Sequence, residues 1–145
     1  MNKILLLPNS KLDGALDCAL RVRNMLQSHR IEVTMLPEIS DRYKTEPYTA
    51  STRERLIDEC DLVVAIGGDG TVFHCAYDAM KANKPILGIN SGRLGFLSQL
   101  ESADLEPLKK LFTGDYSIEH RMVLRVKIHA SNQDYTHYAI NDVVL

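Results

Sequence analysis

The chain has 145 residues, of which 45% are hydrophobic and 25% are charged, a balance typical of a soluble globular protein with one compact core. Its net charge of -2 gives no basic excess, so neither nucleic acid nor an anionic membrane surface is an expected partner. No apolar stretch approaches the roughly 18–20 residues of a membrane-spanning helix, and we see no signal peptide. The cysteines, Cys18, Cys60 and Cys75, form no C-x-x-C pair, so we expect free thiols in a reducing cytoplasm.

Apolar runs and amphipathic segments alternate through the first 90 residues. Strands are predicted at residues 3–7, 31–36, 62–66 and 85–89, and helices at 13–29, from 51 toward 60, and at 71–82. Ser51 and Glu54 have capping-box spacing, which places the start of the second helix at Ser51. Residues 38–49 are polar, lack a clear period and are predicted as a loop. The alternation predicts an α/β fold: a Rossmann-like parallel sheet with flanking helices and right-handed crossovers.

The pattern changes after residue 100. A short helix is predicted at 104–112, ended by Gly114. Residues 122–129 alternate apolar and polar side chains, which is typical of a half-exposed antiparallel strand. A second such strand is predicted at 135–145, joined to the first through a turn at 131–134.

These elements predict two domains. Residues 1–100 are predicted to form an α/β domain, and residues 101–145 a linker helix and the first strands of a β-rich second domain, with the boundary between Phe96 and Tyr116. The sequence stops in mid-strand on three apolar residues, and a lone strand pair is marginally stable. We therefore expect the chain to be the front part of a longer protein.

The stretch Gly67-Gly68-Asp69-Gly70-Thr71 lies between a predicted strand and a predicted helix. In a parallel sheet this place is the carboxyl edge, where ligands bind. The glycines can take positive φ and let a ligand approach the backbone. The N–H groups of Gly70, Thr71 and Val72 are expected to be unpaired at the helix start, so Gly67, Gly68, Gly70 and Thr71 are predicted to bind phosphate. The motif is neither a Walker A loop nor a G-x-G-x-x-G loop.

The carboxylate in this loop has two interpretations. By itself, Asp69 fits a turn or helix-cap aspartate. Beside a phosphate, a carboxylate is electrostatically costly unless it takes a proton from an attacking hydroxyl or binds a Mg²⁺ ion that bridges phosphates. His74 follows in the helix, where it either faces the site and touches a phosphate or is a partly exposed helix histidine.

Two further segments share this edge or add polar groups to it. Residues 90–97, NSGRLGFL, also follow a strand, and we expect Leu94, Phe96 and Leu97 to anchor them in the core. Arg93 fits either a phosphate contact or a solvated surface residue. Asn141-Asp142 precedes an apolar run, where the pair could take ribose hydroxyls or an adenine amine; N-D is also common in turns.

Together these three segments resemble the NAD kinase (ATP-NAD kinase) family, which carries GGDGT, N-x-G-x-L-G-F-L and an N-E or N-D pair in this order. Residues 116–124 also look like the entry into the second domain of that family. The resemblance implies phosphoryl transfer from ATP to the 2'-hydroxyl of the adenosine ribose of NAD, giving NADP. It further implies ATP or polyphosphate as donor, a divalent metal, usually Mg²⁺, and a homodimer or homotetramer in the cytoplasm.

The resemblance also assigns roles to residues. Asp69 would accept the proton of the ribose hydroxyl, Gly70 would line the same pocket, and Asn141 and Asp142 would hold NAD. His74, where many relatives carry a basic residue, is taken as a further NAD contact. Most of the NAD-binding second domain of the family is missing here, so we expect the 145-residue chain to be incomplete for activity.

Two alternatives stay open. One is a non-catalytic NAD- or NADP-binding module, which the short length favours. The other is a lipid kinase of the diacylglycerol type, because such kinases share GGDGT; residues 90–97 and the lack of a membrane-binding segment argue against it.

Overall fold

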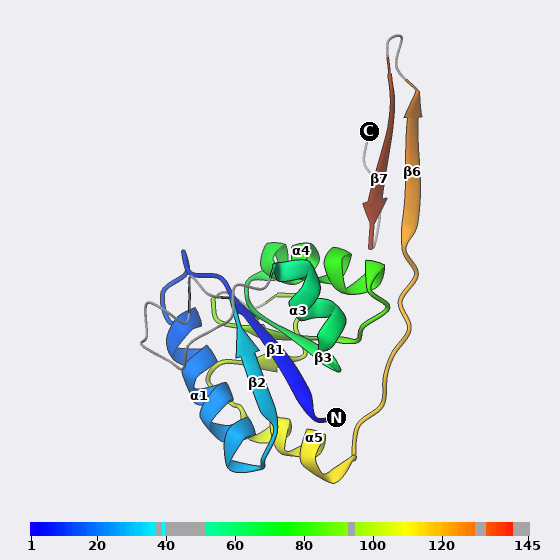
Figure 1. Ribbon diagram of the computed structural model, residues 1–145. Helices are drawn as coiled ribbons and strands as arrows, with labels where there is room; N and C mark the ends of the chain where they lie inside the picture. The colour runs from blue at the N-terminus through cyan, green and yellow to red at the C-terminus, as the bar shows by residue number, and fades with distance from the viewer. Residues whose placement is uncertain (37–38, 40–51, 93–94, 130–132, 141–145) are drawn as a thin grey trace.

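A five-stranded parallel sheet forms the centre of the computed structural model, which describes residues 1–36, 39, 52–92, 95–129 and 133–140 (Figure 1). Its strands are β1 (Lys3–Pro8), β2 (Glu32–Met35), β3 (Leu62–Gly67), β4 (Ile86–Asn90) and β5 (Leu100–Glu101). Their order is β2-β1-β3-β4-β5, and every neighbouring pair is parallel. The predicted α/β fold is therefore confirmed. Strand β5 was not predicted, because two residues are too few to show a period.

Helices pack on both faces of this sheet. They are α1 (Ala15–Ser28), α3 (Arg53–Glu59), α4 (Asp69–Lys81), a 3₁₀ turn η1 (Glu106–Lys109) and α5 (Lys110–Thr113). None of the helices in the described residues is both long and apolar enough to cross a membrane. The loop predicted at 38–49 lies outside the described residues, apart from Ile39, which is buried.

The strands are apolar on both faces because each face meets a layer of helices. Side chains of β1 alternate between two cores: Ile4 and Leu6 pack with α1, whereas Leu5 and Leu7 pack with α3 and α4. All six residues of β3 are buried. The central strand is thus fixed on both sides, and so is the turn that follows it.

Two helices begin at other residues than predicted. Helix α3 starts after Thr52, whose hydroxyl accepts the N–H of Arg55 (N···Oγ1 3.3 Å), and not at Ser51. Helix α4 starts at Asp69, two residues early, because the carbonyl of Gly68 accepts the N–H groups of Thr71 and Val72 (2.9 and 3.2 Å). The acidic residue of the motif is therefore the first residue of a helix.

The segment after β5 belongs to the packing of the sheet. Leu105 and Leu108 are buried in the same core as α1, and α5 ends at Gly114, with φ at 74°, as predicted. The helix predicted at 104–112 is divided into η1 and α5. The domain division after residue 100 stays a prediction.

A separate antiparallel pair, β6 (Leu124–His129) and β7 (Asp134–Ala139), extends away from the sheet (Figure 1). The hairpin contacts α4 where the ring of Tyr138 packs on the ring of Tyr77, with ring centroids 5.6 Å apart. The pair was predicted as half-exposed, but all of its residues are exposed or only partly buried. The part of the second strand predicted at 141–145 lies outside the described residues.

Candidate functional site

The strand order defines where a ligand is expected. From β1 the chain passes to β2 on one side, and from β3 it passes to β4 on the other, so the order reverses between β1 and β3. In open α/β sheets, ligands bind beyond the carboxyl ends of the strands at this reversal. The turn Gly67-Gly68-Asp69-Gly70 stands at that point, directly after β3.

The loops that follow β1 and β3 are joined there by Asn9. Its side-chain amide donates to the hydroxyl of Thr71 (Nδ2···Oγ1 3.0 Å), and its backbone N–H donates to the carbonyl of Ile66 (2.9 Å). Asn9 was not predicted as a site residue, although, like the residues of the other motifs, it is polar and directly follows a buried strand. The hydroxyl of Thr71 accepts this bond and keeps its own proton for a further acceptor.

The three positions of the turn require or favour glycine for different physical reasons. A Cβ on Gly67 would lie 2.5 Å from Oγ1 of Thr71, so packing within the chain excludes a side chain there. A Cβ on Gly68 or Gly70 would have nothing within 4 Å among the described residues. These two glycines leave open space on either side of Asp69, as close approach of a ligand to the backbone requires.

One expectation about this turn is wrong, and one property of its glycines is not used. None of its three glycines has positive φ; the glycines that do are Gly14 and Gly114. The N–H groups of Thr71 and Val72 are not free for a phosphate, because the carbonyl of Gly68 accepts both. The reason is the early start of α4, which places these amides inside the first helical turn. Among the described residues, no backbone carbonyl accepts the N–H of Gly70.

The carboxylate of Asp69 is held by the segment that follows β4. The N–H of Phe96 donates to Oδ2 (2.9 Å) and the N–H of Leu97 donates to Oδ1 (3.1 Å). The first motif, residues 67–71, and the second motif, residues 90–97, therefore meet at this side chain. A Cβ on Gly95 would lie 2.8 Å from Cγ of Asp69 and closer still to Oδ1, so only glycine fits beside the carboxylate.

The apolar residues of the second motif behave differently from one another. Leu97 packs against the core on the α3 and α4 face, as expected. Phe96 was expected to anchor in the core, but 93% of its surface is exposed. The prediction failed because the N–H of Phe96 turns inward to Asp69 and the ring is left outside. Arg93 and Leu94 lie outside the described residues.

Asn90, the first residue of that motif, has a structural place. Its side chain is fully buried and donates to Glu101 (Nδ2···Oε2 3.0 Å), while its Oδ1 accepts the N–H of Gly92 (3.3 Å). The N–H of Ser91 donates to the carbonyl of Gly67 (3.2 Å). The Ser91 bond connects the ends of β3 and β4, and the Asn90–Glu101 bond connects β4 to β5, so both motifs start from one edge of the sheet.

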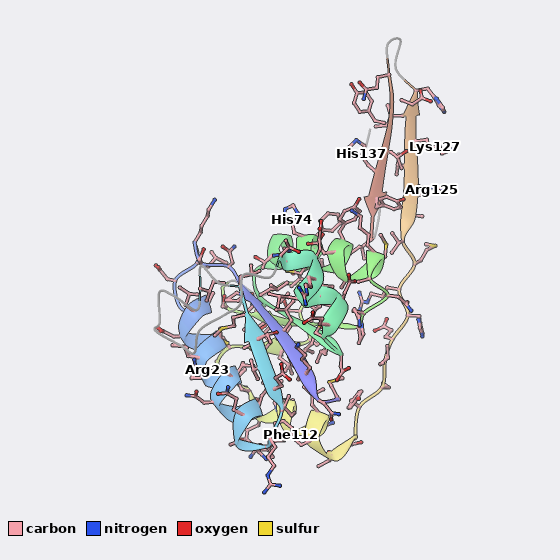
Figure 2. All side chains as sticks on the ribbon, viewed as in Figure 1. Arg23, His74, Phe112, Arg125, Lys127 and His137 are labelled. Carbon is pink, nitrogen blue, oxygen red and sulfur yellow. The ribbon has the colours of Figure 1, made fainter. Side chains whose placement is uncertain are left out.

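The other predicted residues lie apart from this cluster or outside the description. His74 is exposed on the outer surface of α4, edge-on to the ring of Phe73 (Figure 2). Five residues along a helix turn the side chain by about 140°, so His74 does not share the face of Asp69. Asn141 and Asp142 lie outside the described residues, and their role in binding NAD stays a prediction.

Metal-ligating groups do not gather in the described part of the chain, where no three His, Cys, Asp or Glu side chains are placed to hold one ion. Asp69 is the carboxylate at the turn, and each of its oxygens already accepts one amide. Mg²⁺ commonly binds to one or two carboxylates together with substrate phosphates. The described residues therefore fit a Mg²⁺ ion that is bound mainly by the phosphates of a nucleotide.

A parallel sheet with an acidic, glycine-flanked turn at its reversal point defines an open α/β protein with a candidate ligand site at the carboxyl edge of its strands. Comparison with known families narrows this class. The family model described as ATP-NAD kinase N-terminal domain matches residues 4–116, and the chain belongs to that family.

Individual relatives agree with this assignment. The chain is 31% identical to an NAD kinase of Natranaerobius thermophilus over 147 aligned positions, which cover 100% of the chain and 51% of the relative. It is 43% identical to an NAD kinase of Heliobacterium modesticaldum over 95 positions, covering 64% of the chain and 33% of the relative. A solved structure of yeast NADH kinase complexed with NADH has the same fold, with a TM-score of 0.75 at 16% identity, over 97% of the chain and 47% of the yeast protein. The chain thus spans at most about half the length of these relatives.

Proposed function

We propose that the chain is the front part of an NAD kinase, which transfers the terminal phosphoryl group of ATP to the 2'-hydroxyl of the adenosine ribose of NAD and gives NADP. The observation that carries this proposal is Asp69: a carboxylate fixed by two amides at the reversal point of the sheet, with open space beside Gly68 and Gly70. Membership of the ATP-NAD kinase family supports the choice of substrates.

In this proposal Asp69 is the general base. Each carboxylate oxygen has two lone pairs, and one amide occupies one of them, so an oxygen can still accept a hydroxyl hydrogen. Asp69 takes the proton of the 2'-hydroxyl as the oxygen of that hydroxyl attacks the terminal phosphoryl group of ATP. Phosphoryl transfer relies mostly on positioning and on charge stabilisation, and general-base catalysis contributes typically 10²–10⁴-fold. The rigid start of α4 supplies that positioning.

The remaining binding roles follow from the same placement. Gly67, Gly68, Gly70 and Thr71 form the phosphate-facing turn, with the hydroxyl proton of Thr71 as a donor. Asn141 and Asp142 hold NAD, and His74, which lies on another face of α4 than Asp69, contacts a part of NAD away from the reacting hydroxyl. A divalent metal, Mg²⁺, neutralises charge on the phosphates when it is bound, and Asp69 is the protein carboxylate that would face it.

The assembly and setting are proposed from the family resemblance. The full-length protein is a cytoplasmic homodimer or homotetramer, and a β-rich domain beyond the described hairpin completes the NAD site. We propose residues 1–100 as the nucleotide-binding domain and residues 101–145 as the linker helix, which packs on the core of that domain, together with the start of the second domain.

The test is NADP formation from NAD, ATP and Mg²⁺, measured on the 145-residue chain and on the protein extended to its natural end. We expect activity only in the longer form, and a loss of 10²–10⁴-fold in kcat for Asp69→Asn, because an amide cannot take the proton. NAD binding without turnover in the long form would instead indicate a binding module. Phosphorylation of diacylglycerol would indicate a lipid kinase.

A further inference from the structure

We infer that residues 95–97 are the positioning element of Asp69: the amides of Phe96 and Leu97 fix the carboxylate, and Gly95 leaves the room that the carboxylate occupies. The inference rests on the proposed role of Asp69 as the base. It concerns a part of the chain that itself touches no reacting atom: the backbone of the second motif acts on the first motif.

The geometry holds both carboxylate oxygens at once. The amides of Phe96 and Leu97 are consecutive, and they bind Oδ2 and Oδ1 separately, at 2.9 and 3.1 Å. Two donors on separate oxygens fix the rotation of the carboxylate about its last bond, which one donor would leave free. Asp69 itself begins α4, so its backbone is also fixed.

The donors are in turn held against β4. The side chain of Gln99 accepts the N–H of Gly88 (2.9 Å) and donates to the carbonyl of Leu97 (2.9 Å). The backbone N–H of Gln99 donates to the carbonyl of Gly88 (3.0 Å). A Cβ on Gly88 would lie 3.0 Å from Cα of Ser98, so the segment is pressed onto the strand. The sheet therefore sets the position of Asp69 through this segment.

Gly95 is the sensitive point because it has no room for a methyl group. A Cβ there would overlap the carboxylate, so either Asp69 or the segment must move. Gly92 lies in the same motif, but a Cβ there would have nothing within 4 Å among the described residues. Gly92 does not have positive φ, so alanine there carries no left-handed backbone strain. Alanine at Gly95 therefore tests contact with Asp69, and alanine at Gly92 controls for a general effect of a substitution in residues 90–97.

The experiment uses the full-length enzyme and compares Gly95→Ala with Gly92→Ala. We expect kcat to fall about 100-fold in Gly95→Ala, the effect of a misplacement of roughly 1 Å, with KM for NAD within about threefold. Gly92→Ala is expected to keep kcat within about threefold. Thermal unfolding of both variants, compared with that of the wild type, shows whether Gly95→Ala is folded.

A second pair removes a donor. Phe96→Pro and Phe96→Ala both lose the exposed ring, but only proline lacks the N–H that binds Oδ2. We expect kcat of Phe96→Pro to be at least about tenfold below that of Phe96→Ala.

The outcomes separate the two proposals. A wild-type enzyme without kinase activity would overturn the proposed function and this inference together. An active wild type with an inactive Asp69→Asn would support the function, and equal kcat values within both variant pairs would then overturn the positioning role alone. A fall in kcat confined to Gly95→Ala and Phe96→Pro supports it.

Discussion

The two edges of the parallel sheet each carry an aspartate that accepts two backbone amides. At the amino edge, Asp61 accepts the N–H groups of Asn2 and Lys3 on its Oδ2 (2.6 and 3.0 Å), just before β3 begins. At the carboxyl edge, Asp69 accepts the amides of Phe96 and Leu97, just after β3 ends. The same strand therefore lies between two carboxylates with the same number of backbone donors.

Their surroundings differ. The donors of Asp61 are Lys3, the first residue of β1, and Asn2 just before it, so these bonds tie β3 to the adjacent strand β1. Lys3 is paired with Glu32 and Glu59. Asp69 binds the loop that follows β4 and has glycines with open space on both sides. Hydrogen bonds to a carboxylate do not by themselves mark a functional site; the space left for a second molecule beside it does.

The largest expected difference between the two aspartates is in activity, measured on the two asparagine variants. In the full-length enzyme we expect Asp61→Asn to keep kcat within about twofold, because the amino edge is remote from the turn, while Asp69→Asn loses at least about 100-fold. A large fall in kcat for Asp61→Asn, in a protein that unfolds at the wild-type temperature, would show that the two edges are not separate in function.

At the carboxyl edge, the buried Asn90 is expected to contribute to stability. Asn90→Ala removes the buried amide that donates to Glu101 and accepts from Gly92, and leaves those groups without their partner. We expect a loss of about 1–3 kcal/mol in the free energy of unfolding, measured in urea. Gln27→Ala, at an exposed position of α1, is the matched control and should change it by less than about 0.5 kcal/mol. Equal effects would mean that Asn90 does not hold the edge.

The smallest expected effect is the pH dependence at the amino edge. The amides of Asn2 and then Lys3 hold the pKa of Asp61 below its ordinary value of 3.8. A carboxylate with a lowered pKa in the folded state stabilises the fold above its unfolded pKa, and this contribution is lost as the pH falls through the folded pKa. Wild type is therefore expected to be more stable than Asp61→Asn at pH 7, and the difference should shrink below about pH 3.8.

Urea unfolding at a series of pH values measures this difference. Asp58→Asn, at an exposed position of α3, serves as the control carboxylate. A difference between wild type and Asp61→Asn that stays constant from pH 7 into the acid range would contradict the assigned cause.

Local patterns were enough for most of the fold. Five residues of unbroken apolar sequence gave β3, and the helical period gave α1 and α4, because strands and helices bury different residue spacings. The hairpin was also visible from alternation in β6. The ends of the helices were predicted less accurately. Helix α4 begins at Asp69 because the carbonyl of Gly68 accepts its first N–H groups, and no residue type in the sequence indicates that bond.

The position of the site could be predicted, whereas its contacts could not. Because GGDGT follows one buried strand and NSGRLGFL the next, both had to reach the carboxyl edge of a parallel sheet. Nothing local showed that the N–H of Phe96 would bind Asp69, 27 positions away, and so leave its ring exposed. The same holds for Asn9 and Thr71, which are 62 positions apart.

The sequence by itself thus determined the elements, their alternation and the edge at which the polar motifs gather, because these depend on residue spacing along the chain. Only the tertiary structure decided which amides hold Asp69, why Gly95 and Gly67 cannot carry a side chain, and where Gly68 and Gly70 leave space. Those features depend on distances between atoms that the fold brings together from separate segments, and a one-dimensional pattern contains no such distances.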